Sequence, residues 1–328
     1  MGPLQLAGRV LSDPILGLKV SGKLPSSLVG VYQRGGLAYV GGYIAYYFAH
    51  YTGVPLDEAF WSWLKRKNHG SLLRARVLDH SMFLDIEDKG ISRQLLLEGK
   101  REKGSLEVFT RELKRLQQAV GDEFVILDIG GNIGYYVLIE AFAAPRSRIY
   151  AVEPSPVNVN LLKKNVQMDG MAHRIDVTSG AISNKTGKAV LFLSNESNVH
   201  SMERLSDRSI TVPTWTVDEF LSTKGLEPTK VNVLRMDTEG HEAKILEGVG
   251  NLLGANQPLL LFIEFHNTLI RDGHIGKIVD LLKSADLEFV YGCNDYFTGV
   301  VDHLYGLDDL PTNLKRHAAA QVFLKRGY

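Results

Sequence analysis

Short apolar runs alternate with helical patterns along most of the chain. The apolar runs predict buried strands at residues 124–129, 148–152, 175–179, 189–193, 231–236, 259–265, 288–291 and 320–324. Apolar residues at helical spacing predict helices at 134–143, 157–168, 216–223, 241–253 and 275–285. Strands that alternate with helices are typical of an open, mostly parallel sheet covered on both faces. We therefore predict an α/β domain over residues 105–328, entered through an amphipathic helix at 105–120.

The first 104 residues follow a different pattern. Helical stretches, including an aromatic and basic patch at 60–67, come before an alternating run at 77–86. This order predicts one or two helices followed by a strand or a hairpin. We expect residues 1–104 to form an N-terminal cap of helices and a hairpin.

Residues 35–56 contain no Asp, Glu, Lys or Arg, and such a segment is long enough in principle to cross a bilayer. Five glycines and five tyrosines dilute its apolar content. Its larger apolar residues repeat at helical spacing: Leu37, Val40, Ile44, Phe48 and Tyr51. We therefore predict a buried amphipathic helix and keep a membrane contact as the less favoured alternative.

The charge balance narrows the class of partner. Lys plus Arg and Asp plus Glu each number 37, so the formal net charge is zero. A protein that binds a phosphate backbone usually carries a broad basic surface, so the even charge balance argues against a nucleic acid partner. The single cysteine, Cys293, cannot form an internal disulfide, and the N-terminus shows no secretory signal pattern. We expect a cytoplasmic protein.

A glycine turn follows the first predicted strand of the main domain. Residues 125–136 read V-I-L-D-I-G-G-N-I-G-Y-Y, in which Gly130, Gly131 and Gly134 permit a tight turn into a helix. The N-terminus of a helix attracts anionic groups. Asp128, at the end of the strand, would repel a pyrophosphate, and the G-x-G-x-x-G pattern of dinucleotide sites is missing. An NAD-dependent dehydrogenase is therefore disfavoured.

The carboxylate of Asp128 suits a ligand that carries an ammonium group. S-adenosylmethionine combines an ammonium, a carboxylate, a sulfonium and a ribose. Glu153 ends the second strand, 25 residues after Asp128, where an acidic residue accepts hydrogen bonds from ribose hydroxyls in doubly wound folds. The two carboxylates and the glycine turn together predict a site for S-adenosylmethionine.

Residues from about 75 to 325 resemble the FkbM family of class I methyltransferases. The resemblance rests on D-I-G-G-N-I-G-Y-Y, V-E-P-S-P-V-N-V-N-L-L-K-K-N, S-G-A-I-S-N-K-T-G-K-A-V-L-F-L, R-M-D-T-E-G-H-E-A-K-I-L-E-G-V and I-E-F-H, in this order. It implies a Rossmann-like sheet of seven strands whose last strand, near 320–325, runs antiparallel. It also implies that adenine packs near 179–182. Together with the motifs it assigns the cofactor site to Asp128, Gly130, Gly131, Asn132, Gly134, Glu153, Pro154, Ala181 and Asp237.

Candidates for the chemistry follow the fourth and fifth strands. Because ligands of open α/β sheets bind beyond the carboxyl ends of the strands, Asp237, Glu239, His241, Glu264 and His266 are expected around one crevice. Asp237 would orient the substrate or the cofactor. Glu239 and His266 are alternative general bases, since a hydroxyl nucleophile benefits from losing its proton. Each also has a structural interpretation, as a helix cap, a brace of the turn or a core histidine.

A divalent metal on Asp237, Glu239, Glu264 and His266 is an alternative, but no dedicated ligand spacing is present, and we predict metal-independent action. The polar stretch 194–209 is expected to form a hairpin loop at the mouth of the site. There, His200 and Arg204 either contact an acceptor or are solvated. Tyr135 and Tyr136 either face the sulfonium or belong to the core.

The resemblance implies methylation of a hydroxyl group on a sugar, a lipid or a small-molecule metabolite. An RNA methyltransferase and a non-catalytic protein that binds the cofactor are the alternatives. Residues 1–104 would complete the acceptor pocket or form the interface of a homodimer.

Overall fold

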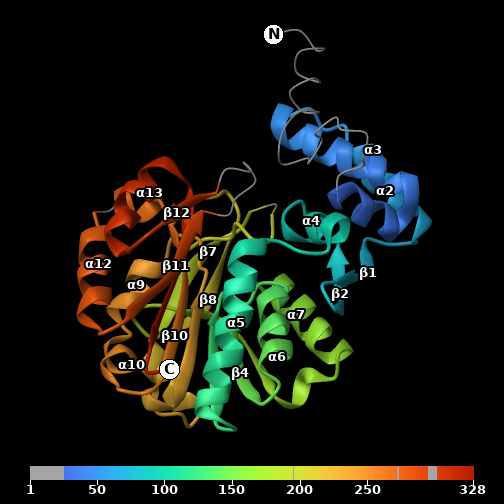
Figure 1. Cartoon of the computed structure of the whole chain (residues 1–328). Coiled ribbons are helices and arrows are strands. Elements are labelled where there is room, and N and C mark those ends of the chain that lie inside the picture. The colour runs from blue at the N-terminus through green and yellow to red at the C-terminus, as the bar shows by residue number, and fades with distance from the viewer. Residues whose placement is uncertain (1–25, 195, 272, 295–300) are drawn as a thin grey trace. The chain divides into compact units, whose positions relative to one another are not determined.

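The computed structural model describes residues 26–194, 196–271, 273–294 and 301–328. They form two compact units, with the described residues up to Arg101 in one and those from Glu102 onward in the other. Figure 1 shows the elements of both units along the chain. The larger unit holds all the predicted site residues, and each unit is described by itself.

The larger unit is built on an eight-stranded sheet in the order β12-β11-β13-β10-β9-β3-β4-β5. The strands are β3 (Phe124–Ile129), β4 (Ser147–Glu153), β5 (Ile175–Ser179), β9 (Val231–Met236), β10 (Leu259–His266), β11 (Glu288–Asn294), β12 (Asp302–Leu304) and β13 (Ala319–Arg326). β13 pairs antiparallel with β10 and β11, whereas β3, β4, β5, β9 and β10 run parallel. This confirms the Rossmann-like α/β fold with an antiparallel last strand. The three-residue β12 adds an eighth strand that the sequence pattern did not predict.

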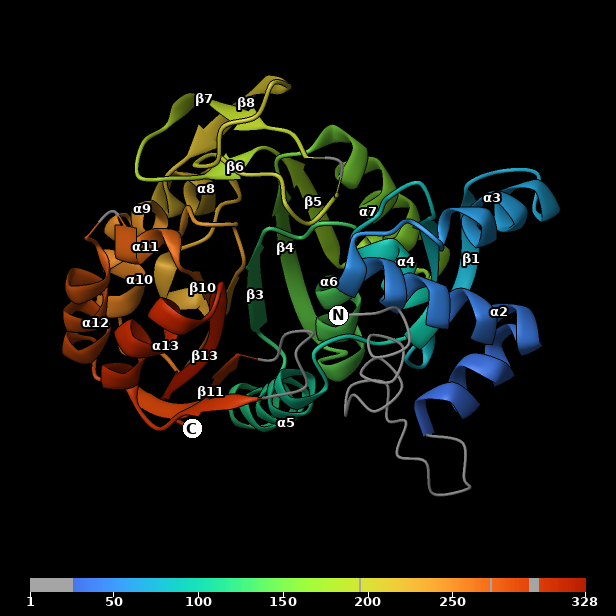
Figure 2. The same ribbon diagram turned by 90° about the horizontal axis from the view of Figure 1, so that it is seen from above.

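Helices cover both faces of this sheet, as Figure 2 shows from above. Its α-helices are α5 (Lys103–Val120), α6 (Tyr135–Ala143), α7 (Pro156–Met168), α8 (Val217–Thr223), α9 (Glu242–Glu247), α10 (Gly250–Gly254), α11 (Thr268–Arg271), α12 (Ile275–Ser284) and α13 (Leu310–Arg316). Short 3-10 turns are η1 (Met171–His173), η2 (Pro228–Lys230) and η3 (Leu307–Asp309). On the α5 side, Phe109 contacts the rings of Tyr136 and Phe262, and Phe262 stacks on Phe323. The central strands are therefore buried on both faces, which explains their continuous apolar runs.

Two details differ from the prediction. The helix expected at 241–253 is divided into α9 and α10 at Gly248, a residue that weakens a helix interior. The strand expected at 189–193 belongs to a separate small sheet of β6 (Ala181–Ile182), β7 (Gly187–Phe192) and β8 (Ser209–Trp215). β8 was not predicted because it contains Pro213, a residue that is rare within strands.

The smaller unit contains α2 (Ser26–Thr52), α3 (Glu58–Lys67), β1 (Leu72–Val77), β2 (His80–Asp85) and α4 (Ile91–Glu98). β1 and β2 form an antiparallel hairpin. None of the described helices is both long enough and apolar enough to cross a membrane.

The face of α2 that is buried differs from the predicted one. Leu37 is 79% exposed and Ile44 is 38% exposed, so the prediction that this stripe is buried is wrong. The side chain of Tyr51 lies outside the described residues. Three tyrosines are buried instead: Tyr43, Tyr46 and Tyr47. Burial of these tyrosines is favoured because their rings pack against one another and the Tyr47 hydroxyl donates a hydrogen bond to Glu98.

Candidate active site

The glycine turn connects β3 to α6 beside the ends of two other parallel strands. The N–H groups of Gly130 and Gly131 donate to the carbonyl of Val152 in β4. Gly130 has a φ of 87°, and a Cβ atom at this position would lie 1.9 Å from the carbonyl oxygen of Asp237. Only glycine fits so close to another backbone. Gly131 and Gly134 serve packing, since both lie against Leu162 of α7.

Glu153 ends β4 and is held by three donors. Its carboxylate accepts hydrogen bonds from the backbone N–H groups of Asn132 and Ser155, each at 2.9 Å, and from the Asn158 side-chain amide at 3.2 Å. Burial raises the pKa of Glu153 to about 7, although these donors favour the charged form. The glutamate thus lies where the sequence predicted an acceptor for ribose hydroxyls.

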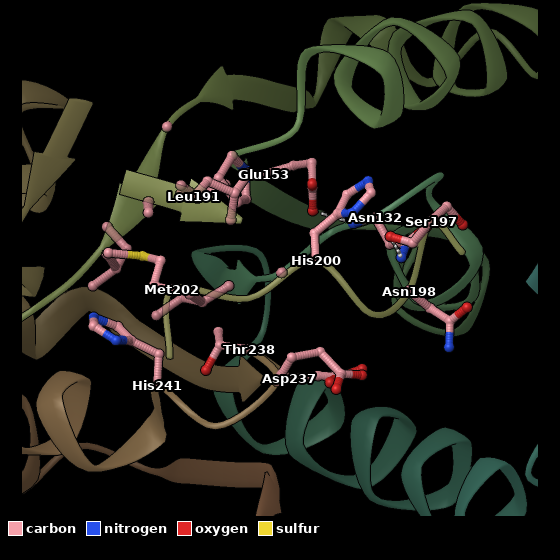
Figure 3. A pocket seen from close by; sticks show the side chains of 18 residues that line it. Asn132, Glu153, Leu191, Ser197, Asn198, His200, Met202, Asp237, Thr238 and His241 are labelled. Atoms are coloured by element: carbon pink, nitrogen blue, oxygen red, sulfur yellow. Dashed lines mark hydrogen bonds between the residues drawn. The ribbon is translucent and has the colours of Figure 1, made fainter. Parts of the chain in front are cut away.

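A pocket of about 600 Å³, counted with its space open to solvent, lies at the carboxyl ends of these strands (Figure 3). Its lining residues are Ile129, Gly130, Asn132, Val152, Glu153, Pro154, Gly180, Ala181, Ile182, Leu191, Ser197, Asn198, His200, Met202, Asp237, Thr238, Glu239 and His241. Most of the residues assigned to the cofactor from sequence therefore meet at one cavity. Three residues assigned to the cofactor do not line it: Asp128, Gly131 and Gly134. The catalytic candidate His266 does not line it either.

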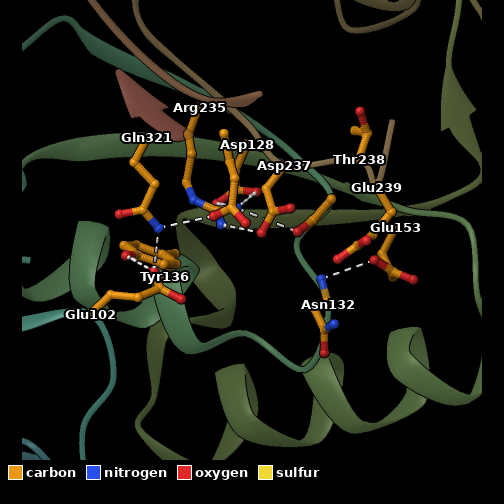
Figure 4. Close-up of polar contacts among 12 residues, drawn as sticks. Glu102, Asp128, Asn132, Tyr136, Glu153, Arg235, Asp237, Thr238, Glu239 and Gln321 are labelled. Atoms are coloured by element: carbon orange, nitrogen blue, oxygen red, sulfur yellow. Dashed lines mark hydrogen bonds and ion pairs between the residues drawn. The ribbon is translucent and has the colours of Figure 1, made fainter. Parts of the chain in front are cut away.

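Asp128 is fully buried and forms an ion pair with Arg235. The Arg235 Nη1 atom lies 3.2 Å from Oδ1 and 3.4 Å from Oδ2 of Asp128, and Nη2 donates to Asp237 Oδ2 at 3.1 Å (Figure 4). The expected contact between Asp128 and an ammonium group of the cofactor is therefore not what the structure shows. Arg235 on the neighbouring strand balances the charge of this carboxylate, and of the two aspartates that Arg235 binds, only Asp237 lines the pocket.

Tyr136 also contacts Arg235. The guanidinium carbon of Arg235 lies 4.1 Å from the centroid of the Tyr136 ring, and the Tyr136 hydroxyl donates to Glu102. The cation on this ring is thus an arginine of the chain, and Tyr136 does not line the pocket. Partial burial raises the pKa of Asp237 to about 6, whereas Arg235 acts to lower it.

Glu239 is presented by a turn with unusual backbone geometry. Glu239 has a φ of 53° and Gly240 a φ of 104°, so two successive residues are left-handed. Such a conformation is costly for glutamate and persists only where its surroundings enforce it. The Glu242 Oε1 atom accepts hydrogen bonds from the N–H groups of Thr238 and Gly240, at 3.3 and 3.1 Å. Glu242 therefore organises the turn, a role that sequence reasoning missed.

His266 connects Glu242 to Glu239. Its Nδ1 atom lies 2.9 Å from Glu242 Oε1, and its Nε2 atom lies 3.4 Å from Glu239 Oε2. Burial alone would lower the pKa of His266, but Glu242 and Glu239 raise it well above its usual value. A charged imidazolium has no free lone pair, so it cannot accept a proton from a substrate.

Glu264 lies behind the pocket wall. The side-chain amide of Gln321 donates to Glu264 and to Glu102, at 2.9 Å each. Burial, together with the charges of Asp237 and Glu102, raises the pKa of Glu264 well above its usual value. Glu264 does not line the pocket, whereas its neighbour Asp237 does.

The pocket loop, taken as residues 193–194 and 196–208 between β7 and β8, lines one side of the cavity with Ser197, Asn198, His200 and Met202. The sequence predicted a loop at the site over 194–209. The Ser197 carbonyl accepts hydrogen bonds from the side-chain amides of Asn132 and Asn158, at 3.2 and 3.0 Å. Arg204 approaches Glu239 Oε2 at 3.4 Å, whereas His200 lines the pocket. The loop is thus tied both to the glycine turn and to the turn at Glu239.

His241 anchors the same loop. Its Nδ1 atom lies 2.6 Å from Glu203, and its Nε2 atom lies 2.9 Å from Ser183 Oγ. Lys244 donates to the same Glu203 oxygen at 2.9 Å. His241 is therefore buried and engaged at both ring nitrogens.

The cluster of Asp237, Glu239 and His266 has donor atoms within 4.8 Å of one another, a spacing that could hold a metal ion. However, Arg235 and Arg204 already pair with the two carboxylates, and Glu242 and Glu239 favour the charged form of His266. These cations balance part of the negative charge that a metal ion would meet. Metal-independent action therefore stays a prediction.

The strand order and the pocket define a class I, Rossmann-like methyltransferase domain. The model of the methyltransferase FkbM domain matches residues 128–291. The chain belongs to the FkbM methyltransferase family.

Curated relatives match parts of the chain. The hexuronic acid methyltransferase AglP of Haloferax volcanii is 28% identical over 139 residues, which are 42% of this chain and 54% of that protein. Methyltransferase 1 of Beauveria bassiana is 27% identical over 150 residues, or 39% of this chain and 59% of that protein. The 31-O-demethyl-FK506 methyltransferase FkbM of Streptomyces tacrolimicus is 22% identical over 213 residues, or 55% and 78%. The chain thus covers a little more than half of the first two relatives.

Among solved structures, TYW2 of P. horikoshii in complex with MeSAdo has a TM-score of 0.41 at 10% identity, covering 81% of each chain. TYW2 of M. jannaschii in complex with AdoMet has a TM-score of 0.38 at 11% identity, covering 78% of this chain and 87% of that one.

Proposed function

We propose that this protein is an S-adenosylmethionine-dependent methyltransferase that acts on a hydroxyl group of a sugar or another small molecule. The observation that carries the proposal is one pocket that joins the glycine turn, Glu153 and the carboxylates of Asp237 and Glu239. Membership of the FkbM family and the sugar named for the Haloferax relative support the same class of reaction.

The residues present fit the cofactor. The N-terminus of α6, which follows the glycine turn, favours an anionic group such as a carboxylate. The N–H groups of Gly130 and Gly131 are already donated to Val152, so these two glycines shape the turn. Glu153 accepts hydrogen bonds from ribose hydroxyls. Apolar residues at the other end of the pocket, Ala181 and Leu191, suit the adenine ring.

Asp237 replaces Asp128 as the group that meets the positive end of the cofactor. It lines the pocket and is 29% exposed, whereas Asp128 is buried. Asp128 fixes Arg235, and Arg235 fixes Asp237. Asp128 is therefore a positioning residue in this proposal.

Glu239 acts as the general base. S-adenosylmethionine, when bound, supplies a methyl group on a positively charged sulfur. Glu239 would accept the proton of the acceptor hydroxyl as its oxygen takes the methyl group. His266, held by Glu242, lies 3.4 Å from Glu239 Oε2 and positions this carboxylate at the pocket. His266 thus acts through Glu239 and not as the base.

The remaining expectations stay predictions. Action on RNA is disfavoured, because no Lys or Arg lines the pocket within the part of the chain that the structure describes. A lipid acceptor, a homodimer and a cytoplasmic location are compatible with the site, and buried Cys293 fits a reducing compartment. The membrane contact through 35–56 remains the less favoured alternative.

Calorimetry with S-adenosylhomocysteine tests the cofactor site. We expect binding by the wild type, and large losses of affinity in Glu153→Ala and in Asp128→Ala. Unchanged affinity in both variants, or tighter binding of NAD, would overturn the assignment. Transfer of a labelled methyl group to sugar, lipid, small-molecule and RNA fractions then tests the class of acceptor.

A further inference from the structure

One buried serine of the pocket loop contacts the turn that presents Glu239. The Ser201 hydroxyl donates a hydrogen bond to the backbone carbonyl of Glu239 at 2.8 Å, and Ser201 is only 1% exposed. The same oxygen accepts hydrogen bonds from the backbone N–H groups of Glu203 and Arg204, at 3.0 and 3.2 Å. A hydroxyl offers one donor and two acceptor positions, and Ser201 uses all three.

The bond from Ser201 reaches the peptide group that gives this turn its unusual shape. The peptide joins Glu239, with a φ of 53°, to Gly240, with a φ of 104°. Its carbonyl accepts from Ser201, and its N–H donates to Glu242 Oε1 at 3.1 Å. Side chains from the pocket loop and from α9 therefore hold the two polar atoms of one peptide plane. A left-handed glutamate persists only where its surroundings enforce it, and Ser201 is one of the two groups that do so here.

Ser201 is itself fixed by the small sheet. Its N–H donates to the carbonyl of Phe192 at 3.1 Å, and its carbonyl accepts from the N–H of Phe192 at 2.9 Å. Phe192 is the last residue of β7, which pairs with β8. The neighbours of Ser201 in the chain, His200 and Met202, line the pocket (Figure 3). The hydroxyl that meets Glu239 is thus carried by backbone that a strand holds in place.

The turn that Ser201 closes also carries a cation next to the Glu239 carboxylate. Arg204, which is 39% exposed, lies 3.4 Å from Glu239 Oε2 through its Nη1 atom. Glu203 accepts a hydrogen bond from Lys244 of α9 at 2.9 Å. The two N–H groups that bind Ser201 belong to these same residues, Glu203 and Arg204. Loss of the hydroxyl would therefore release the backbone of Glu239 and also loosen the arginine beside its side chain.

The other end of the pocket loop is held by separate contacts. The Ser197 carbonyl accepts from the side-chain amides of Asn132 and Asn158, and both asparagines also donate to Glu153. Ser201 takes no part in these hydrogen bonds. The loop thus has one attachment on the cofactor side and another on the side of Glu239, and a change at Ser201 affects the second.

We infer that Ser201 is the positioning residue of the general base, because its hydroxyl fixes the peptide between Glu239 and Gly240 and so aims the Glu239 carboxylate at the pocket. This inference rests on the proposed function. It does not depend on the identity of the acceptor, since Ser201 is buried and does not line the pocket. Ser201 acts on the rate of methyl transfer and not on the binding of the cofactor.

Hydrogen exchange of the full-length protein tests the contact without an acceptor. In Ser201→Ala the backbone amides of residues 238–242 should exchange at least about tenfold faster than in the wild type. Ser206→Ala is the matched control, since the Ser206 hydroxyl donates to the Leu193 carbonyl of the same loop at 2.8 Å, is exposed and does not line the pocket. It should leave exchange at 238–242 unchanged. Unchanged exchange there in Ser201→Ala would overturn the inference.

Kinetics distinguish a positioning role from general support of the loop. Methyl transfer is measured with labelled S-adenosylmethionine and the acceptor fraction that the wild type methylates. Ser201→Ala should lower kcat by about 10–100-fold, because a displacement of about 1 Å at a catalytic group costs this much. The affinity for S-adenosylhomocysteine should stay close to that of the wild type, since the contacts of Ser197 remain. An affinity that falls as far as kcat would contradict the inference, and no transfer by the wild type would overturn the proposed function together with it.

A double-mutant cycle shows whether Ser201 acts through Glu239. In a Glu239→Gln background, Ser201→Ala should have little further effect on kcat, because the base that it positions is already lost. The same fold-loss in both backgrounds would mean that the serine acts independently of Glu239, which overturns the inference. A wild-type rate in Glu239→Gln would remove the base assignment, and the inference with it, while methyl transfer itself stands. Ser201→Cys keeps the shape of the side chain with a weak donor, and it serves in all three tests if the alanine variant is unstable.

Discussion

Arg235 and Asp128 form a buried ion pair on two neighbouring parallel strands, with the Arg235 Nη1 and Asp128 Oδ1 atoms 3.2 Å apart. The same guanidinium reaches Asp237 at 3.1 Å, so Asp128, within β3, acts on the pocket through Arg235. Loss of Asp128 leaves the buried charge of Arg235 with only part of its compensation, from Asp237, and a buried charge that loses a partner is strongly destabilising.

Asp128→Asn should therefore lower the free energy of unfolding by about 3–5 kcal/mol. It should also weaken binding of S-adenosylhomocysteine, because Arg235 and Asp237 lose their fixed position. Urea unfolding and calorimetry measure the two effects. Glu140→Gln is the matched control: burial and the charge of Asp128 raise the pKa of Glu140 well above its usual value, which favours the neutral form that an amide resembles. Equal destabilisation by both variants would argue against the ion pair.

The affinity for S-adenosylhomocysteine should depend on the ionisation of Glu153. Burial raises the pKa of Glu153 to about 7, and the protonated form loses one acceptor for the ribose hydroxyls. Affinity should therefore fall as the pH drops below the pKa, by up to about tenfold per pH unit. Calorimetry between about pH 5.5 and 8.5 measures this. In Glu153→Gln the affinity should be lower and nearly independent of pH, and a wild-type affinity that stays flat over this range would contradict the assignment.

Glu242→Gln should remove the negative charge of residue 242 while keeping the hydrogen bonds that its side-chain oxygen accepts. Oε1 of Glu242 accepts from Thr238, Gly240 and His266, whereas Oε2 has no hydrogen-bond partner, so an amide can keep the turn while it removes the charge. We expect a stable protein in which the pKa of His266 is lower. Nuclear magnetic resonance titration of His266 reports the pKa directly. As the pH rises, His266 should lose its proton earlier in the variant, so the rate of methyl transfer should begin to decline at a lower pH than in the wild type. A large loss of stability instead would mean that Glu242 is only structural.

Removal of divalent cations should leave methyl transfer unchanged. Arg235 and Arg204 already pair with Asp237 and Glu239, so no metal ion is needed to balance these carboxylates. The rate is measured after dialysis against a chelator, with and without added magnesium. A loss of activity that magnesium restores would show that the cluster binds metal.

Gly130→Ala should disrupt the glycine turn. The added Cβ would lie 1.9 Å from the carbonyl oxygen of Asp237, and this backbone cannot move without displacing β9. We expect weaker binding of S-adenosylhomocysteine and a lower melting temperature. Gly250→Ala is the control, since a Cβ there meets nothing within 4 Å and should stabilise α10 by about 0.4–1 kcal/mol. Similar melting temperatures for Gly130→Ala and the wild type would contradict the steric argument.

Local patterns explain why much of the fold and part of the site could be predicted. Buried parallel strands produce continuous apolar runs, and β3, β4 and β9 begin and end within a residue of their predicted positions. The glycine turn and Glu153 were found because both depend on short-range backbone chemistry at the end of a strand. The short edge strand β12 and the strand that contains Pro213 have no such signal.

The sequence by itself determined the class of fold, the place of the pocket and the type of its cofactor, because these depend on periodicity and on turn residues that are close together in the chain. Only the tertiary structure decided what each charged side chain does. Asp128 pairs with Arg235 because β3 and β9 are adjacent, although the two residues are 107 positions apart. Glu242 meets His266 because α9 begins beside the end of β10. The partner of a buried charge is set by which strands become neighbours, and that depends on the packing of the whole chain.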